Sequence, residues 1–399
     1  MNSPIKLKLV FIYLLVFVGF IPSQGVTGDA LSTFSRLNNA GLIVLDSQGQ
    51  TVMANHADMP LMPASTTKLA TAWLALAHWG EEHRFRTQFY LDESTQTLWV
   101  KGSGDPYLVS EELDVAARNL KQKGLNHIKA IGIDTSLFQP GLVLPGTGTT
   151  DNPYDAVPTA VAANFNTIAV RSIGGQVVSA ESVTPLTEYS KSYGNSIRSG
   201  ELRVNTGANP HNAEKYFAEL LGALLQKNNI VTGSQIIFGQ VPSTAIFYTH
   251  VNTKTLGEIV RSMLKYSTNF VANQLILMLS AEHYQRPANT ADVQRFMEES
   301  LFRRFNWHNF SLADGAGLSR NNRLSPHQLT ELLLAFRKWK HLLPEIEPGI
   351  YAKSGTLTGV SALAGYLVNR GEWRPFAVVM NDNVPSHLRN LIARELSGR

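Results

Sequence analysis

The sequence contains no cysteine in its 399 residues. Disulfide bonds, a catalytic thiol and a cysteine-ligated metal are therefore excluded. Its 11 histidines include no His-Glu-x-x-His pattern, in which two histidines on one helix face bind zinc. Gly102-Ser103-Gly104 lacks the further glycine and the helix start of a nucleotide-binding loop. We therefore expect neither a metal nor another cofactor.

Long runs of positive charge and of hydrophobic residues are also missing. The formal net charge is only +4, and no cluster of Lys and Arg or basic-aromatic stripe occurs, so we expect no nucleic-acid partner. The apolar run over residues 9–21 is shorter than the roughly 20 residues that cross a bilayer.

The N-terminal segment has the layout of a secretory signal. Lys6 and Lys8 precede the apolar run, and small residues follow it. We expect residues 1–25 to be a signal peptide that exports the chain to the periplasm or the exterior of the cell envelope. A retained N-terminal anchor is the alternative.

Strand patterns occur at both ends of the remaining chain. Residues 41–46 and 50–54 flank a Ser-Gln-Gly turn and predict a β-hairpin. Residues 351–368 and 373–380 predict two or three further strands. A helical pattern with an apolar face follows Pro63. The simplest assembly is an α+β (α/β) fold, in which one antiparallel sheet is built from both ends and covered by helices.

The middle of the chain has a different composition. Residues 86–205 are rich in short strand-like runs, glycine and proline, which predicts an inserted β-rich domain with one subdomain. Helical periodicity resumes at 212–226 and 256–264. We therefore assign residues 26–85 and 206–399 to one domain and residues 86–205 to the insertion.

The first chemical motif is Ser65-Thr66-Thr67-Lys68 at the start of the predicted helix. Three residues make about one helical turn, so the Ser65 hydroxyl and the Lys68 amine can meet on one face. Burial against Leu69 and Trp73 would lower the pKa of the lysine and fit it to take the serine's proton. The pattern predicts a serine nucleophile with a lysine base.

Two further motifs support this interpretation. Ser267-Thr268-Asn269 lies between two predicted helices, and Lys353-Ser354-Gly355-Thr356 lies on a predicted strand whose glycine lets a ligand backbone approach. Ser-x-x-Lys, Ser-x-Asn and Lys-Thr-Gly together are typical of class A β-lactamases and penicillin-binding proteins. All three occur here in that order.

With these motifs the sequence resembles the low-molecular-mass penicillin-binding D-Ala-D-Ala carboxypeptidases and endopeptidases that carry a domain inserted after the nucleophile helix. The resemblance covers most of the chain after residue 25 and includes Met62-Pro63-Ala64, Gly104-Asp105-Pro106 and the residues at 314–320. It also accounts for the long separation of Ser65 from Ser267. The sequence departs from the family at Ser354, commonly threonine, and at Ala316, commonly serine.

The resemblance implies a serine β-lactamase/DD-peptidase-like fold and an acyl-enzyme reaction. Ser65 would attack the penultimate D-alanine with Lys68 as base, Ser267 would relay a proton, and Asn269 would position substrate or lysine. Lys353 would supply positive charge. The expected partners are peptidoglycan peptides ending in D-Ala-D-Ala, and β-lactam antibiotics as covalent inhibitors.

The strand motif and the insertion supply the expected substrate-binding residues. The resemblance assigns oxyanion binding to the backbone N–H groups of Ser65 and Thr356, and binding of the terminal carboxylate to the Ser354 and Thr356 hydroxyls beside Gly355. In the insertion, we expect one of three residues to read an amine on the third residue of the stem peptide: Asp151, Tyr154 or Asp155.

Two other functions share these motifs. A class A-like β-lactamase would add a glutamate for deacylation, and no convincing Glu-x-x-Leu-Asn element lies between Ser65 and the Lys-Ser-Gly strand. A non-catalytic or slow penicillin-binding sensor would keep the fold, although the nucleophile and base are intact. The balance of carboxypeptidase and endopeptidase activity and the oligomeric state stay open.

Overall fold

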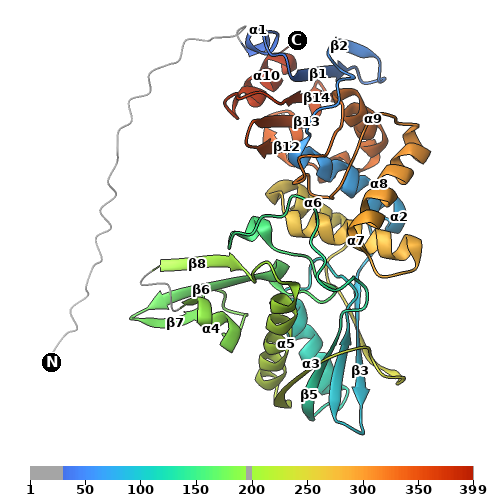
Figure 1. Ribbon diagram of the computed structural model, residues 1–399. Coiled ribbons are helices and arrows are strands. Elements are labelled where there is room, and N and C mark those ends of the chain that lie inside the picture. Colours follow the sequence, from blue (N-terminus) through green and yellow to red (C-terminus); the bar gives the residue numbers. More distant parts are fainter. Residues whose placement is uncertain (1–29, 195–199, 399) are drawn as a thin grey trace, which may run out of the picture.

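The computed structural model describes residues 30–194 and 200–398, so the predicted signal peptide at 1–25 lies outside the described residues. The chain forms a main domain and an insertion (Figure 1). The main domain contains a six-stranded antiparallel sheet in the order β11-β12-β13-β14-β1-β2. Its strands are β1 (Ala40–Leu45), β2 (Thr51–Asn55), β11 (Glu345–Glu347), β12 (Ile350–Leu357), β13 (Val360–Asn369) and β14 (Glu372–Met380).

This sheet confirms the predicted hairpin and its assembly from both ends of the chain. β1 pairs with β14, with Ile43 opposite Ala377, and every residue of β1 is buried because helices cover both faces of the sheet. One face carries α1 (Ala30–Phe34) and α10 (Leu388–Ser397). The apolar core on the other face includes α2 (Lys68–Trp79), α6 (Leu256–Tyr266), α7 (Asn269–Tyr284), α8 (Thr290–Phe305) and α9 (Pro326–Phe336).

The insertion is built around a second sheet, with strand order β10-β3-β4-β5-β9. Helices α3 (Ser110–Gln122) and α5 (Pro210–Lys227) share its buried core. Its strands are β3 (Arg86–Asp92), β4 (Thr97–Lys101), β5 (His127–Asp134), β9 (Val231–Phe238) and β10 (Ile246–Val251). β3 and β10 pair, so the chain enters and leaves the insertion on neighbouring strands.

This topology corrects the predicted boundary of the insertion. The sheet extends to Val251, so ending the insertion at residue 205 was wrong. The error has a physical cause: α5 buries its apolar residues, among them Tyr216, Phe217 and Leu220, in the core of the insertion. Helical periodicity shows that a helix has an apolar face, but not which sheet covers it.

The insertion also holds a second, smaller sheet, so the expectation of one subdomain was wrong. Strands β6 (Thr167–Ile173), β7 (Gln176–Ser179) and β8 (Gly200–Asn205) form it, and α4 (Glu188–Gly194) packs on it. The loop that precedes β6 contains the short helical turns η2 (Pro153–Asp155) and η3 (Asn164–Asn166), both of which contact α7. The insertion therefore reaches the main domain through this loop.

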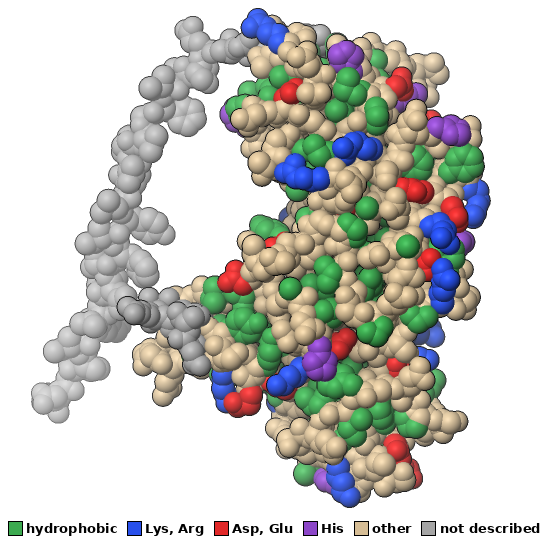
Figure 2. Space-filling model, viewed as in Figure 1, with side chains coloured by type: hydrophobic (Ala, Val, Ile, Leu, Met, Phe, Trp, Pro, Cys, Tyr) green, Lys and Arg blue, Asp and Glu red, His purple; other side chains and the backbone are tan. Residues whose placement is uncertain are grey.

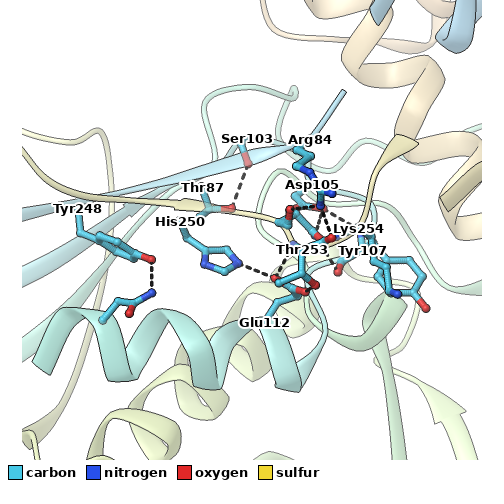
Figure 3. Close-up of polar contacts among 12 residues, drawn as sticks. Arg84, Thr87, Ser103, Asp105, Tyr107, Glu112, Tyr248, His250, Thr253 and Lys254 are labelled. Carbon is cyan, nitrogen blue, oxygen red and sulfur yellow. Dashed lines mark hydrogen bonds and ion pairs between the residues drawn. The ribbon is translucent and has the colours of Figure 1, made fainter. Parts of the chain in front are cut away.

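A buried polar network joins the insertion to the main domain (Figure 3). The Asp105 carboxylate accepts hydrogen bonds from Asn252 Nδ2 at 3.1 and 2.9 Å. Glu112 lies 2.8 Å from His250 Nε2 and accepts a hydrogen bond from Thr253 N at 3.1 Å. Because these residues stand where β10 leads into α6, the network fixes the point at which the chain leaves the insertion.

Among residues 30–194 and 200–398, no helix is both long and apolar enough to cross a membrane.

We predict that Asp105 makes stability depend on pH. Burial raises its pKa to about 6, so the folded state binds a proton more tightly than the unfolded chain. Stability should therefore fall as pH rises from about 4 to about 6, by at most roughly 3 kcal/mol. Asp105→Asn should remove this contribution, because the amide stays neutral and its oxygen still accepts from Asn252. Urea denaturation of parent and variant across this range measures the difference; parallel pH profiles would contradict the prediction.

Candidate active site

Ser65 lies in a strained turn, η1 (Ala64–Thr67), immediately before α2. Ala64 has a φ of +48°, which is unfavourable for a residue with a Cβ atom. Gly317 packs against this turn with a φ of +84°, and a Cβ there would come within 1.9 Å of the Ala64 carbonyl oxygen. Strained backbone of this kind persists only where its surroundings hold it. Gly317 is therefore required for the backbone conformation of the turn that carries Ser65.

Lys68 is fully buried, and three oxygen atoms surround its amine. Nζ lies 2.9 Å from Ser65 Oγ, 2.8 Å from Asn269 Oδ1 and 2.7 Å from the Ala316 carbonyl oxygen. The last two oxygens can only accept hydrogen bonds. A neutral amine donates its two N–H groups to them and directs its lone pair at the Ser65 hydroxyl. This arrangement suits proton removal from Ser65.

The second motif brings Asn269 to the lysine. Ser267 ends α6 in the left-handed conformation, with a φ of +56°, and Asn269 opens α7, so the predicted turn between two helices is confirmed. Asn269 Nδ2 donates to the Tyr154 carbonyl oxygen at 3.1 Å, which directs its Oδ1 at Lys68. Among the residues that the structure describes, no hydrogen bond involves the Ser267 hydroxyl.

The third motif lies on β12, beside Ser65. Lys353 and Gly355 share one face of the strand, and a Cβ at Gly355 would lie 2.7 Å from the Pro63 carbonyl oxygen and 3.0 Å from Ser65 N. The glycine thus admits the turn that carries Ser65. Lys353 is buried, and its Nζ donates to the Ser354 carbonyl oxygen at 2.7 Å.

The outer edge of β12 is partly free. β11 pairs only with Ile350 and Tyr351, so within the described sheet residues 353–357 have a partner on one side alone, in β13. Figure 2 shows the surface hollowed between the main domain and the insertion, on the side where β12 lies in Figure 1, and Lys and Arg side chains lie on the upper rim.

The three predicted residues of the insertion, Asp151, Tyr154 and Asp155, differ in their surroundings. Asp151 and Tyr154 are exposed. The Asp155 carboxylate accepts hydrogen bonds from Gly148 N at 3.0 Å and Thr150 Oγ1 at 2.5 Å, so it holds its own loop together. The backbone of Tyr154 is the part of this segment that touches the catalytic motifs.

A family model for the D-Ala-D-Ala carboxypeptidase 3 (S13) family matches residues 29–193 and 196–346. The chain belongs to this family. The D-alanyl-D-alanine carboxypeptidase DacB of Haemophilus influenzae is 24% identical over 88% of this chain and 90% of the relative. The D-alanyl-D-alanine carboxypeptidase of an Actinomadura species is also 24% identical, over 90% of this chain and 81% of the relative.

Solved structures of similar proteins confirm the predicted DD-peptidase fold. The crystal structure of penicillin binding protein 4 from Haemophilus influenzae has a TM-score of 0.75 and 22% sequence identity, covering 94% of this chain and 100% of that one. A predatory peptidoglycan endopeptidase from Bdellovibrio bacteriovorus has a TM-score of 0.55 and 13% identity, covering 90% and 91%. The sequence-based family and fold predictions are confirmed, and the protein is a serine DD-carboxypeptidase of the S13 family.

The electrostatics of this carboxypeptidase lower the pKa of the Lys68 amine. Burial lowers the pKa of Lys68 well below its ordinary value; the nearby charge of Lys353 lowers it further, while Asp314 opposes both. Asp314 is itself buried and accepts the backbone N–H groups of Ala316, Leu318 and Ser319. It therefore holds the loop that brings the Ala316 carbonyl to Lys68.

Sequence reasoning missed three contributors to the site. Two are the carbonyl oxygens of Ala316 and Tyr154, which any residue type could supply, so the sequence carries no signal for them. The third is Arg389 of α10, whose Nη1 donates to the Gly355 carbonyl oxygen at 2.6 Å and to Thr356 Oγ1 at 2.7 Å. A lone arginine on a predicted terminal helix could not be told from a surface residue.

We predict that Lys353→Met moves the acidic limb of the pH profile for acylation to higher pH. Removing this positive charge should raise the pKa of Lys68, so a higher pH is needed to obtain the neutral base. The second-order rate constant for acylation by a fluorescent penicillin between pH 5 and pH 9 measures the shift. Lys265→Met, which removes an exposed charge, is the matched control. A lower acylation rate without a shift of the acidic limb would show that Lys353 does not change the pKa of Lys68.

Proposed function

We propose that Ser65 is the nucleophile and Lys68 the general base in hydrolysis of peptides that end in D-Ala-D-Ala. The observation that carries the proposal is the arrangement around Lys68 Nζ, with two acceptor-only oxygens at 2.7 and 2.8 Å and the Ser65 hydroxyl at 2.9 Å. Burial and Lys353 lower the pKa of the amine, which frees it to accept a proton, while the charge of Asp314 opposes this shift.

The first half-reaction transfers the acyl group to the enzyme. As Ser65 Oγ attacks the carbonyl carbon of the penultimate D-alanine, its proton passes to Lys68 Nζ. The backbone N–H groups of Ser65 and Thr356 stabilise the oxyanion. Ser267 relays the proton from Lys68 to the leaving amine, the peptide bond breaks and D-alanine departs. Water then hydrolyses the ester at Ser65 and restores the serine hydroxyl.

The free edge of β12 provides the substrate-binding surface. An extended peptide can pair with residues 353–357, because that edge lacks a neighbouring strand in the described sheet. The hydroxyls of Ser354 and Thr356 bind the terminal carboxylate beside the charge of Lys353, Gly355 keeps the strand close to Ser65, and Asn269 positions both substrate and base.

The chemistry also indicates partners and location. β-Lactams carry an acyl group and a carboxylate in a similar arrangement, and the similar penicillin binding protein 4 of Haemophilus influenzae has been crystallised in complex with a β-lactam. Peptidoglycan peptides lie outside the cytoplasmic membrane, so this function needs the export that the N-terminal sequence predicts. The same acyl-enzyme chemistry permits cleavage of cross-links between stem peptides.

Two substitutions test the proposed function. Ser65→Ala should abolish both D-alanine release from a D-Ala-D-Ala peptide and covalent labelling by a fluorescent penicillin, because the acylated atom is gone. Lys68→Ala should slow acylation by about 10² to 10⁴-fold through loss of the base. Ser243→Ala, on an exposed loop of the insertion, is the control. Labelling that persists in Ser65→Ala would overturn the assignment, and labelling without D-alanine release in the parent would support a sensor instead.

We propose that Asp151, in the insertion, binds a free amine on the side chain of the third stem-peptide residue. Its carboxylate is exposed and has no hydrogen bond among the described residues, whereas Asp155 is engaged within its loop. Tyr154 positions this segment through its contact with Asn269. A carboxylate near the cleft favours a substrate ammonium by a charge-assisted hydrogen bond.

Asp151→Asn should therefore reduce the preference for the free amine. The measurement is kcat/KM for two D-Ala-D-Ala peptides, one with a free and one with an acetylated side-chain amine at the third residue. We expect the free/acetylated ratio to fall by about 3- to 10-fold in the variant, as for a partly exposed charge pair. Glu188→Gln, an exposed carboxylate on α4, is the control. An unchanged ratio in Asp151→Asn would rule out this role.

A further inference from the structure

Arg389 reaches the strand motif from the side of the sheet opposite to Ser65. It stands in the first turn of α10, which packs with α1 on the face of the sheet that carries Ile350 and Ala352. Alternation along β12 places Thr356 on that same face, with Lys353 and Gly355 on the other. The two hydrogen bonds from Arg389 Nη1 to the Gly355 carbonyl oxygen and Thr356 Oγ1 thus tie the last helix to the motif.

Within the part of the chain that the structure describes, the charge of Arg389 has no anionic partner. Among residues 30–194 and 200–398, no carboxylate lies within ion-pair distance of its guanidinium, and its buried Nε has no hydrogen-bond partner. Burial lowers its pKa, and no carboxylate raises it. Arg394 on the same helix differs, because its Nη2 donates to Glu347 at 3.0 Å. An unpaired and partly buried cation is costly unless an anion joins it.

The hydrogen bonds of Thr356 show where that anion binds. Thr356 Oγ1 accepts from Arg389 Nη1, so the hydroxyl proton of Thr356 is directed away from the guanidinium and remains available as a donor. Thr356 is exposed, whereas Lys353 is buried and donates to the Ser354 carbonyl oxygen. The charge of Arg389 also lowers the pKa of Lys353, so the two cations lie close enough to act on the same region of β12.

We propose that Arg389 orients the Thr356 hydroxyl toward the terminal carboxylate of the substrate and supplies the positive charge that this carboxylate meets. It acts as a specificity-determining residue for a free C-terminus, in addition to the charge of Lys353. This role rests on the proposed function, since it names how the same site recognises the end of its substrate.

The test compares substrates with and without the carboxylate. Arg389→Gln keeps an amide donor but removes the charge, and Arg389→Lys keeps the charge. For a peptide ending in D-Ala-D-Ala, Arg389→Gln should lower kcat/KM by about 10- to 100-fold, mainly through KM, as for loss of a charge-assisted contact. The same peptide with a C-terminal amide should change by less than about twofold. Arg389→Lys should recover part of the loss.

Arg394→Gln is the matched control, because it removes an arginine of the same helix that pairs with Glu347. It should leave the acid/amide ratio at the parent's value. Equal losses for acid and amide in Arg389→Gln would overturn the proposal and show a structural role only.

A second readout separates this proposal from the proposed function. Acylation rates for benzylpenicillin and its methyl ester report the carboxylate contact even without peptide turnover. A parent that hydrolyses the terminal peptide bond of neither peptide would contradict the hydrolytic function, while the penicillin acid/ester ratio would still decide the role of Arg389. An acid/ester ratio that is equal in the parent and Arg389→Gln would overturn that role.

Discussion

The site depends on one interaction, the enclosure of the Lys68 amine by three oxygens from separate parts of the chain. Ser65 comes from the turn before α2, Asn269 from the start of α7, and the Ala316 carbonyl from the loop that Asp314 holds. A buried amine needs partners, and these partners fix where its lone pair points. The left-handed Ala64 and the obligatory Gly317 follow from this geometry, because both bring the nucleophile's turn against the loop of Ala316.

A second constraint is the accumulation of positive charge along β12. Lys353 lowers the pKa of Lys68, and burial together with Arg389 lowers the pKa of Lys353 to about 8. In the free enzyme, burial and this mutual repulsion lower the pKa values of both lysines. In the proposed reaction the repulsion is relieved, since the substrate would bring a carboxylate and develop an oxyanion beside the same strand. On this proposal, the three basic residues both lower the pKa of the base and attract the anionic end of the substrate.

The sequence predicted the local structure of the three motifs better than it predicted the extent of the domain around them. Each motif fixes its own local geometry, so three features could be recognised from the sequence: the spacing of Ser65 and Lys68, the turn at Ser267 and the strand of Lys353. The end of the insertion was misplaced because the apolar face of α5 does not reveal which sheet it packs against. The second sheet was missed because β6 pairs with β8, which is distant in the sequence. The Ala316 carbonyl and Arg389 act through backbone atoms and tertiary placement, for which no local pattern exists. The catalytic and substrate-binding roles of the site residues, including Ser267 and Asp151, stay predictions.

The most direct test of a neutral Lys68 base is the titration of its own amine. Proteins labelled with ¹⁵N-lysine, with the Lys68 signal assigned by its loss in Lys68→Arg, report protonation by NMR as pH is varied. The structure predicts a midpoint well below 10.5, because burial and Lys353 disfavour the ammonium. A midpoint near 10.5 would mean that Lys68 is charged at neutral pH and would contradict its role as the base that activates Ser65.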